Sequence, residues 1–197
     1  MIYNIKDIDD TTLIYKLMSQ TIIPRPIAWA VTKNSEVINI APFSYFMALS
    51  SNPATCIVSI GKKKSLEPKD TLKNILETKS CTICLPEVKD LEKLHYSSKA
   101  LDANISEAKE FNIQTEEIFS DFPPVIKDTP VAYFCTFNQL IKIGGKTTPI
   151  ILNIEHIYLR EDIIKDKKSA QITYFPLGRL GKSYCTIGDI LKAPDIP

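Results

Sequence analysis

The stretch IAWAVTKNSEVINIAPFSYFMALSSNPATCIVSI, residues 27–60, decides the fold class. Residues 27–32, 36–46 and 54–60 are rich in β-branched and aromatic side chains, which favour strands. Lys33-Asn34-Ser35 is a turn signal between the first two runs. The pattern predicts three consecutive antiparallel strands arranged as a meander.

Further strand patterns follow later in the chain. CTICLP (81–86), VAYFCTFNQLIKI (131–143) and TPIILNIEHIYLR (148–160) are typical of strands. Gly144-Gly145-Lys146 joins the last two, and paired glycines allow the positive φ angles of a tight hairpin. Many short strands with few helices predict a mainly β fold, an antiparallel barrel with peripheral helices.

Three segments fall outside this strand pattern. TTLIYKLMSQ (11–20) and TLKNILETK (71–79) place apolar residues at helical spacing, and Asp70 stands where it would cap the second helix. Residues 88–124 are the least regular, and we expect a helical or loop excursion from the barrel. This excursion is the best candidate for covering a site.

Length and charge limit the organisation and the partners. The chain has 197 residues, of which 44% are hydrophobic and 24% charged, so we expect one domain, residues 1–197, around one core. The formal net charge of +1 gives no global field for nucleic acid or an anionic membrane. We therefore expect neither partner, and any anion must be bound locally.

The sequence favours a cytoplasmic location. MIYNIKDIDD at residues 1–10 lacks the basic start and apolar core of a signal peptide, and no later run is long and apolar enough to span a bilayer. Five scattered cysteines are an odd set that suits reduced thiols rather than a disulfide framework.

A candidate anion site lies in SLEPKDTLKN, residues 65–74. Ser65, Lys69 and Thr71 supply donors at a predicted helix N-terminus, where free amides and the helix dipole favour an anion. The alternative is an ordinary capped surface helix. No GxGxxG or Walker loop occurs among the six glycines, which disfavours a Rossmann-type site.

Residue types offer little for catalysis by protein groups or for a metal. His95 and His156 are the only histidines, and no Cys-His or Ser-His arrangement is supported, so we expect no catalytic residue. Cys81 and Cys84 form a C-x-x-C without partner cysteines at metal-ligand spacing, and in a strand they would face opposite sides. We predict no metal site, and the pattern leaves the role of this pair open. It also leaves open whether Trp29 and the nearby aromatics pack in the core or stack on a cofactor.

Four stretches carry a resemblance to a known family: RPIAWAVT (25–32), INIAPFSYF (38–46), KDTLKNI (69–75) and GRLGKSY (178–184). In this order, and spread over most of the chain, they resemble the flavin reductase-like family. The resemblance implies a six-stranded antiparallel Greek-key split barrel with peripheral helices. It also implies a homodimer that holds FMN in a groove near the subunit interface.

The resemblance implies three groups of cofactor-binding residues. Those against the isoalloxazine ring and ribityl chain would be Asn39, Ala41, Pro42, Phe43 and Ser44. Those framing the ribityl and phosphate end would be Ser59, Gly61, Ser65, Lys69, Asp70 and Thr71. Those near the cofactor or the dimer contact would be Arg25, Trp29, Arg179 and Tyr184, for which strand-end salt bridging and packing is the alternative.

The family resemblance implies an oxidoreductase that passes a hydride from NAD(P)H to flavin, and then electrons to free flavin, ferric complexes, a partner oxygenase or a redox protein. Such chemistry requires no protein acid or base. One alternative is a flavoredoxin-like FMN electron carrier that does not use NAD(P)H. Another is a barrel that has lost flavin and serves as a binding module. Glu36, Leu85 and Lys182 depart from the family's pattern, so neither the choice of nucleotide nor the electron acceptor is carried over.

Overall fold

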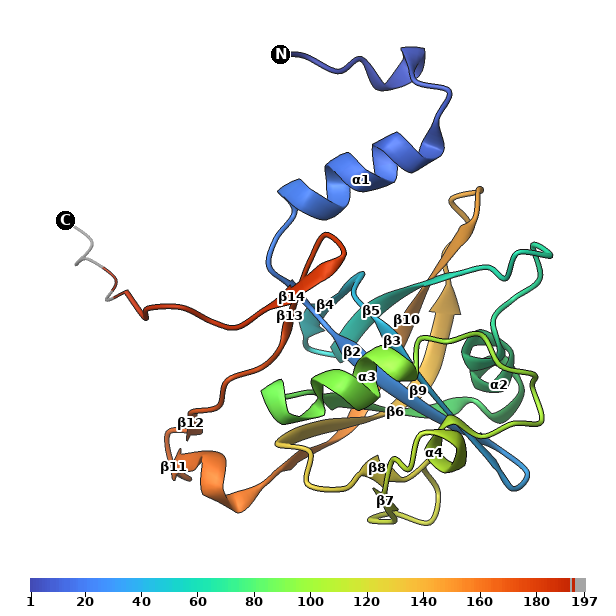
Figure 1. Cartoon of the computed structure of the whole chain (residues 1–197). Coiled ribbons are helices and arrows are strands. Elements are labelled where there is room, and N and C mark those ends of the chain that lie inside the picture. The colour runs from blue at the N-terminus through green and yellow to red at the C-terminus, as the bar shows by residue number, and fades with distance from the viewer. Residues whose placement is uncertain (192, 194–197) are drawn as a thin grey trace.

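The computed structural model describes residues 1–191 and 193, and its centre is a large antiparallel sheet (Figure 1). Across the described residues this sheet has seven strands in the order β3-β2-β6-β9-β10-β5-β4. Their bounds are Ala28–Asn34 (β2), Val37–Phe43 (β3), Phe46–Ser51 (β4), Ala54–Gly61 (β5), Ser80–Leu85 (β6), Val131–Leu140 (β9) and Thr147–Leu159 (β10). The mainly β prediction is confirmed.

Shorter elements surround the main sheet. The α-helices are α1 (Thr11–Thr21), α2 (Asp70–Thr78), α3 (Leu91–Tyr96) and α4 (Glu107–Glu110). The 3-10 helices are η1 (Ile5–Asp7), η2 (Val88–Asp90) and η3 (Glu161–Ile163). Small ladders join β1 (Arg25–Pro26) with β13 (Gly178–Leu180) and β14 (Ser183–Cys185), β7 (Thr115–Glu116) with β8 (Val125–Ile126), and β11 (Ile164–Asp166) with β12 (Gln171–Ile172).

The resemblance implied six strands and the residue pattern implied a meander of residues 27–32, 36–46 and 54–60, and both predictions are wrong. Asn52-Pro53 is a turn signal that makes residues 46–51 a separate strand, β4, paired with β5. Strand β5 therefore pairs with β4 and β10 and not with β3, and the sheet has seven strands rather than six. The Greek-key connection stays a prediction.

The two edges of the main sheet are consecutive in the chain. Strands β3 and β4 lie at opposite ends of the strand order, yet only Ser44 and Tyr45 separate them. Two residues span little more than 10 Å, so the sheet must be rolled until its edges approach at this corner. No ladder joins β3 to β4 in the described residues, and the sheet is not closed.

Both faces of the sheet are buried, which β6 shows clearly. Cys81 and Ile83 face a cluster inside the rolled sheet, here called the inner cluster, where Leu72 and Ile75 of α2 complete the packing. Cys84 faces a second cluster, here called the outer cluster, which includes residues of the 88–124 excursion. Alternate side chains of a strand point to opposite faces, and this confirms that Cys81 and Cys84 do so.

The helix starts differ in how they are capped. The Asp10 carboxylate accepts a hydrogen bond from the Thr12 amide at 2.8 Å and caps α1. Asp70 does not cap α2: it is the first helical residue, and Lys69 occupies the cap position without a side-chain hydrogen bond. Burial of one apolar face sets the position of α2, because Leu72 and Ile75 must reach the core.

The predicted hairpin between β9 and β10 is confirmed, with φ angles of +78° at Gly144 and +74° at Gly145. Within residues 1–191 and at 193, no helix has both the length and the apolar character to cross a membrane. The domain prediction extends over residues 192 and 194–197, which lie outside the described residues.

Ile83 tests the packing of the central sheet. It is fully buried on β6, so Ile83→Ala should lower the free energy of unfolding by about 2–5 kcal/mol. Ile143→Ala, at a side chain that is 66% exposed, should change it by less than about 0.5 kcal/mol. Urea unfolding followed by circular dichroism measures both, and similar losses in the two variants would contradict this packing.

Candidate functional site

A cleft of about 500 Å³, here called the polar cleft, lies at the start of α2. Strand β3, the loop before α2 and the 88–124 excursion form its walls. Its lining residues are Asn39, Ala41, Pro42, Lys62, Lys63, Lys64, Ser65, Lys69, Asp70, Thr71, Ser97, Ser98, Lys99, Ala100, Leu101 and Glu107. Its volume suits a small-molecule ligand.

The start of α2 presents free backbone amides to the polar cleft, an arrangement that suits an anion. The first helical amides, at residues 70–72, find no acceptor among the described residues, because the first intrahelical bond runs from Lys73 N to Lys69 O at 3.0 Å. Free amides at a helix start carry partial positive charge and bind anions.

Charged side chains strengthen this preference for an anion. Among the described lining residues, five are lysines and two are acids, Asp70 and Glu107. Asp70 is paired with Lys63 at 2.7 Å, so its negative charge is balanced. Partial burial lowers the pKa of Lys69 and so works against its positive charge. The remaining positive charge surrounds the free helix start.

A buried hydrogen-bond network forms the floor of the polar cleft. The Thr71 hydroxyl donates to Asn39 Oδ1 at 2.9 Å, and the Thr32 hydroxyl donates to the same oxygen at 3.4 Å. Asn74 Nδ2 donates to Thr32 Oγ1 at 3.0 Å. The network therefore ties the first turns of α2 to strands β2 and β3.

Glu107 of α4 completes this network from the excursion. Its Oε2 atom accepts from Asn39 Nδ2 and from the Ile40 amide, each at 2.9 Å. Burial raises the pKa of Glu107, and these two hydrogen bonds oppose that rise.

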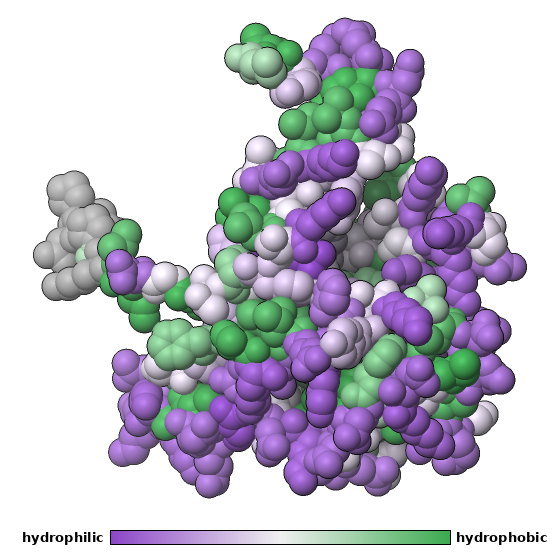
Figure 2. Space-filling model, viewed as in Figure 1, coloured by the Kyte–Doolittle hydropathy of each residue, from purple (hydrophilic) through white to green (hydrophobic). Residues whose placement is uncertain are grey.

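A smaller cleft of about 170 Å³, here called the side cleft, continues from the polar cleft. Both are lined by Pro42 and Ser98, so they adjoin along β3, and the two clefts together are here called the channel. The other lining residues of the side cleft are Tyr15, Ile27, Ser44, Arg179 and Tyr184. Figure 2 shows a hollow on the viewed face between α1 and α3, with mostly hydrophilic side chains around it.

Aromatic and charged groups shape the side cleft. The Arg179 guanidinium lies 4.4 Å from the centre of the Tyr184 ring, a cation–π contact. His95 Nδ1 lies 3.1 Å from the Tyr184 hydroxyl oxygen. The paired strands β13 and β14 place Arg179 opposite Tyr184.

The channel brings together ten of the fifteen residues that the resemblance suggested. Those in the polar cleft are Asn39, Ala41, Pro42, Ser65, Lys69, Asp70 and Thr71. Those lining only the side cleft are Ser44, Arg179 and Tyr184. The five outside the channel are Arg25, Trp29, Phe43, Ser59 and Gly61.

Two of the five residues outside the channel, Trp29 and Phe43, pack in the core. Trp29 is 1% exposed, and its Nε1 donates to Ser97 Oγ at 2.9 Å. It therefore holds Ser97, which lines the polar cleft, from the core side. Phe43 packs in the inner cluster, with Lys69 Nζ 5.7 Å from its ring centre. Ser59 and Gly61 lie on β5, where the Ser59 amide donates to Tyr45 O at 2.8 Å.

Arg25 connects the end of α1 to the sheet. Its buried guanidinium donates to the carbonyl oxygens of Ser19 and Ile22 and to Ser44 Oγ. Among the described residues it forms no ion pair, so of the alternative for Arg25, strand-end salt bridging and packing, the structure shows the packing. Carbonyl dipoles stabilise its charge instead.

The prediction from the sequence missed part of the channel. The missed residues are Tyr15, Ile27, Lys62, Lys63, Lys64, Ser97, Ser98, Lys99, Ala100, Leu101 and Glu107. The run of lysines at 62–64, directly after a strand, was a usable signal. Part of the excursion lines the polar cleft, but which of its residues do so depends on contacts distant in sequence.

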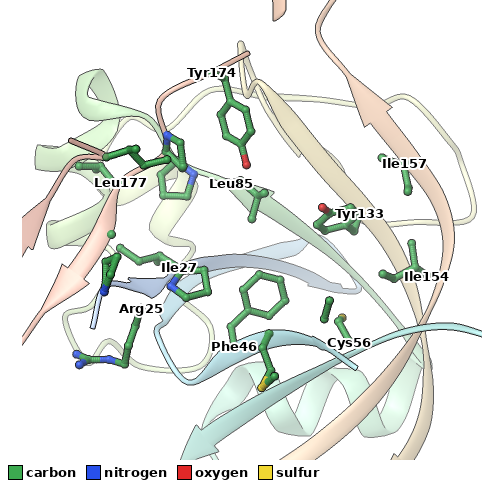
Figure 3. Close-up of a pocket in the computed structure, with 18 of the residues that line it drawn as sticks. Arg25, Ile27, Phe46, Cys56, Leu85, Tyr133, Ile154, Ile157, Tyr174 and Leu177 are labelled. Carbon is green, nitrogen blue, oxygen red and sulfur yellow. The ribbon is translucent and has the colours of Figure 1, made fainter. Parts of the chain in front are cut away.

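A third cleft, here called the apolar cleft, has a volume of about 640 Å³ and lies between β4, β10 and the segment before β13. Figure 3 shows that apolar side chains line most of it and that Tyr133 and Tyr174 direct their hydroxyl groups inward. Burial raises the pKa of Tyr174 to about 12. Arg25 and Ile27 lie at its border with the channel.

The chain belongs to the flavin reductase like domain family, whose model matches residues 18–188. Three solved structures of similar fold are nitrilotriacetate monooxygenase component B from Bacillus cereus, 2-nitrobenzoate 2-nitroreductase NbaA from Pseudomonas fluorescens, and an FMN-binding protein from Thermus thermophilus. The first has 24% identity and a TM-score of 0.90 over 98% of each chain. The second has 24% identity and a TM-score of 0.88 over 100% of this chain and 96% of that one. The third has 15% identity and a TM-score of 0.75 over 88% of this chain and 92% of that one.

Glu107 should make stability depend on pH. Its pKa in the folded state lies above the ordinary 4.5, so its contribution is present below about pH 4 and is lost as the pH rises through the raised pKa. Relative to Glu107→Gln, the native chain should therefore lose free energy of unfolding over that window. Urea unfolding at successive pH values measures the difference, with exposed Glu110→Gln as the control. A difference for Glu107→Gln that does not change with pH would contradict the burial of an ionisable carboxyl group.

Proposed function

We propose that this protein is an FMN-binding oxidoreductase, a flavin reductase that passes a hydride from NAD(P)H to flavin. The observation that carries the proposal is the uncapped, lysine-rich start of α2, which opens into a channel along β3. An anion site at one end and a narrow cleft at the other suit a ligand with a terminal phosphate and a flat ring. Membership of the flavin reductase like domain family supports the same conclusion.

The residues present fit FMN along the length of the channel. The free amides at 70–72 and the surrounding lysines would hold the phosphate. Asn39 and Ala41 would lie along the ribityl chain, and Pro42 and Ser44 would border the ring. When bound, the flavin supplies the hydride-accepting and electron-donating chemistry. The protein's own contribution is to orient the ring and limit the access of water.

We propose that the acceptor of electrons is free flavin or a partner oxygenase. The Bacillus cereus neighbour is named as component B of a monooxygenase, which supports a partner of this kind. A hydride donor would approach from the side cleft, where Arg179 offers a positive charge to a nucleotide phosphate.

The proposed phosphate-binding site at the start of α2 predicts a preference for FMN over riboflavin. FMN should bind at least about ten-fold more tightly at low salt, because charge-assisted hydrogen bonds hold its phosphate. Lys69→Met should weaken FMN by about ten-fold and leave riboflavin within about two-fold. Fluorescence titration measures both affinities, with exposed Lys165→Met as the control. Equal affinities for FMN and riboflavin would contradict a phosphate-binding site at the start of α2.

Anaerobic titration of the FMN-loaded protein with NADH and then NADPH tests the reductase proposal. We expect one nucleotide to bleach the visible flavin absorbance rapidly and so to identify the donor. Dithionite serves as the control that the bound flavin is reducible. Flavin that dithionite reduces but neither nucleotide reduces would favour the electron-carrier alternative.

We also propose a homodimer that forms through the apolar cleft. Met47 and Ile157 line that cleft and are each 59% exposed, and exposed apolar surface of this kind marks protein interfaces. Sedimentation should give twice the chain mass of 22.2 kDa. The double variant Met47→Lys, Ile157→Lys should sediment as a monomer, whereas Ile143→Lys should not. A monomeric native chain would overturn this part of the proposal.

A cytoplasmic location is the corresponding proposal for the cell. All five cysteines are free thiols in the structure, and Cys185 is the only one not buried among the described residues. Thiols of this kind suit a reducing compartment.

A further inference from the structure

Glu107 is an ionisable group that the proposed flavin chemistry does not use. Its side chain is 6% exposed, and it belongs to α4 of the excursion rather than to the stretches that carry the family resemblance. A buried carboxylate costs free energy unless hydrogen bonds compensate it. Its position at the cleft floor therefore calls for an explanation.

The carboxylate of Glu107 determines which way the Asn39 amide points. An ionised carboxylate only accepts hydrogen bonds, so the Asn39 nitrogen must face it, as the 2.9 Å contact shows. The Asn39 oxygen then faces the Thr71 hydroxyl at the start of α2. The second N–H of Asn39 finds no acceptor among the described residues, while Asn39 lines the cleft.

We propose that Glu107 is a positioning residue of the flavin site, which fixes the amide plane of Asn39 so that its second N–H is presented to the bound ligand. The inference rests on the proposed function for the identity of that ligand. Glu107 itself acts through Asn39. The excursion thereby fixes the orientation of a ligand-facing amide on β3, a strand more than sixty residues earlier in the sequence.

Ser106 provides a matched control on the same helix turn. Its hydroxyl donates to the Ile38 carbonyl oxygen at 2.6 Å, so it also joins α4 to β3. Among the described residues it makes no hydrogen bond to the Asn39 side chain, and it does not line the polar cleft. A role that is merely structural would make Ser106 and Glu107 equivalent, whereas a positioning role makes them different.

FMN affinity in four variants provides the first test. Glu107→Ala should weaken FMN binding about three- to ten-fold, the effect of one misplaced hydrogen bond. Glu107→Asp should also weaken FMN binding, because the shorter side chain places its carboxylate oxygen farther from Asn39. Glu107→Gln retains an acceptor oxygen and should stay within about two-fold, as should Ser106→Ala. In an Asn39→Ala background, Glu107→Ala should have almost no further effect. Equal weakening by Ser106→Ala, or an undiminished effect in the Asn39→Ala background, would overturn the proposal.

The side-chain amide signals of Asn39 in the ligand-free protein provide the second test. Proton–nitrogen NMR should show one Asn39 Nδ2 proton shifted downfield and protected from exchange by the carboxylate. Glu107→Ala and Glu107→Asp should remove this signature, and Ser106→Ala should preserve it. Unchanged Asn39 signals in all variants would overturn the positioning role. A native chain that shows the signature but binds no FMN would instead contradict the proposed function alone.

Discussion

The backbone amides that open α2 have no acceptor within the described part of the chain, and the site is organised around them. Lys69 holds the cap position, yet a lysine cannot accept a hydrogen bond from those amides. The Thr71 hydroxyl donates to Asn39, and among the described residues it accepts no hydrogen bond from those amides. The helix start is therefore open to water or to an anion from outside the protein, and the surrounding lysines favour an anion.

The fold places this helix start beside β3 for reasons of packing. Leu72 and Ile75 are buried in the inner cluster, which fixes α2 against β2 and β3. Strand β3 ends where the chain turns at Ser44 and Tyr45 into β4, and Pro42 of the strand and Ser44 of the turn border the channel. The excursion then covers the outer cluster and supplies the opposite wall, from Ser97 to Glu107. Family membership and channel geometry thus point to the same ligand class.

The sequence predicted the features that local patterns control. Alternating apolar residues located the strands, and helical spacing identified the buried face of α2. The resemblance implied six strands, but the turn at Asn52-Pro53 makes residues 46–51 a separate strand and the sheet has seven. The wall formed by residues 97–101 and Glu107 could not be predicted, since its contacts with β3 join segments distant in sequence. Composition also could not decide between core and cofactor for Trp29, which the structure places in the core.

The central claim is that the free start of α2 binds the phosphate of a flavin. Its most direct test is a proton–nitrogen NMR titration of the backbone amides with FMN. The account predicts that the amides of Asp70, Thr71 and Leu72 shift most strongly and saturate together, and that riboflavin moves them much less. Shifts confined to residues of the apolar cleft, with the start of α2 unmoved, would contradict it.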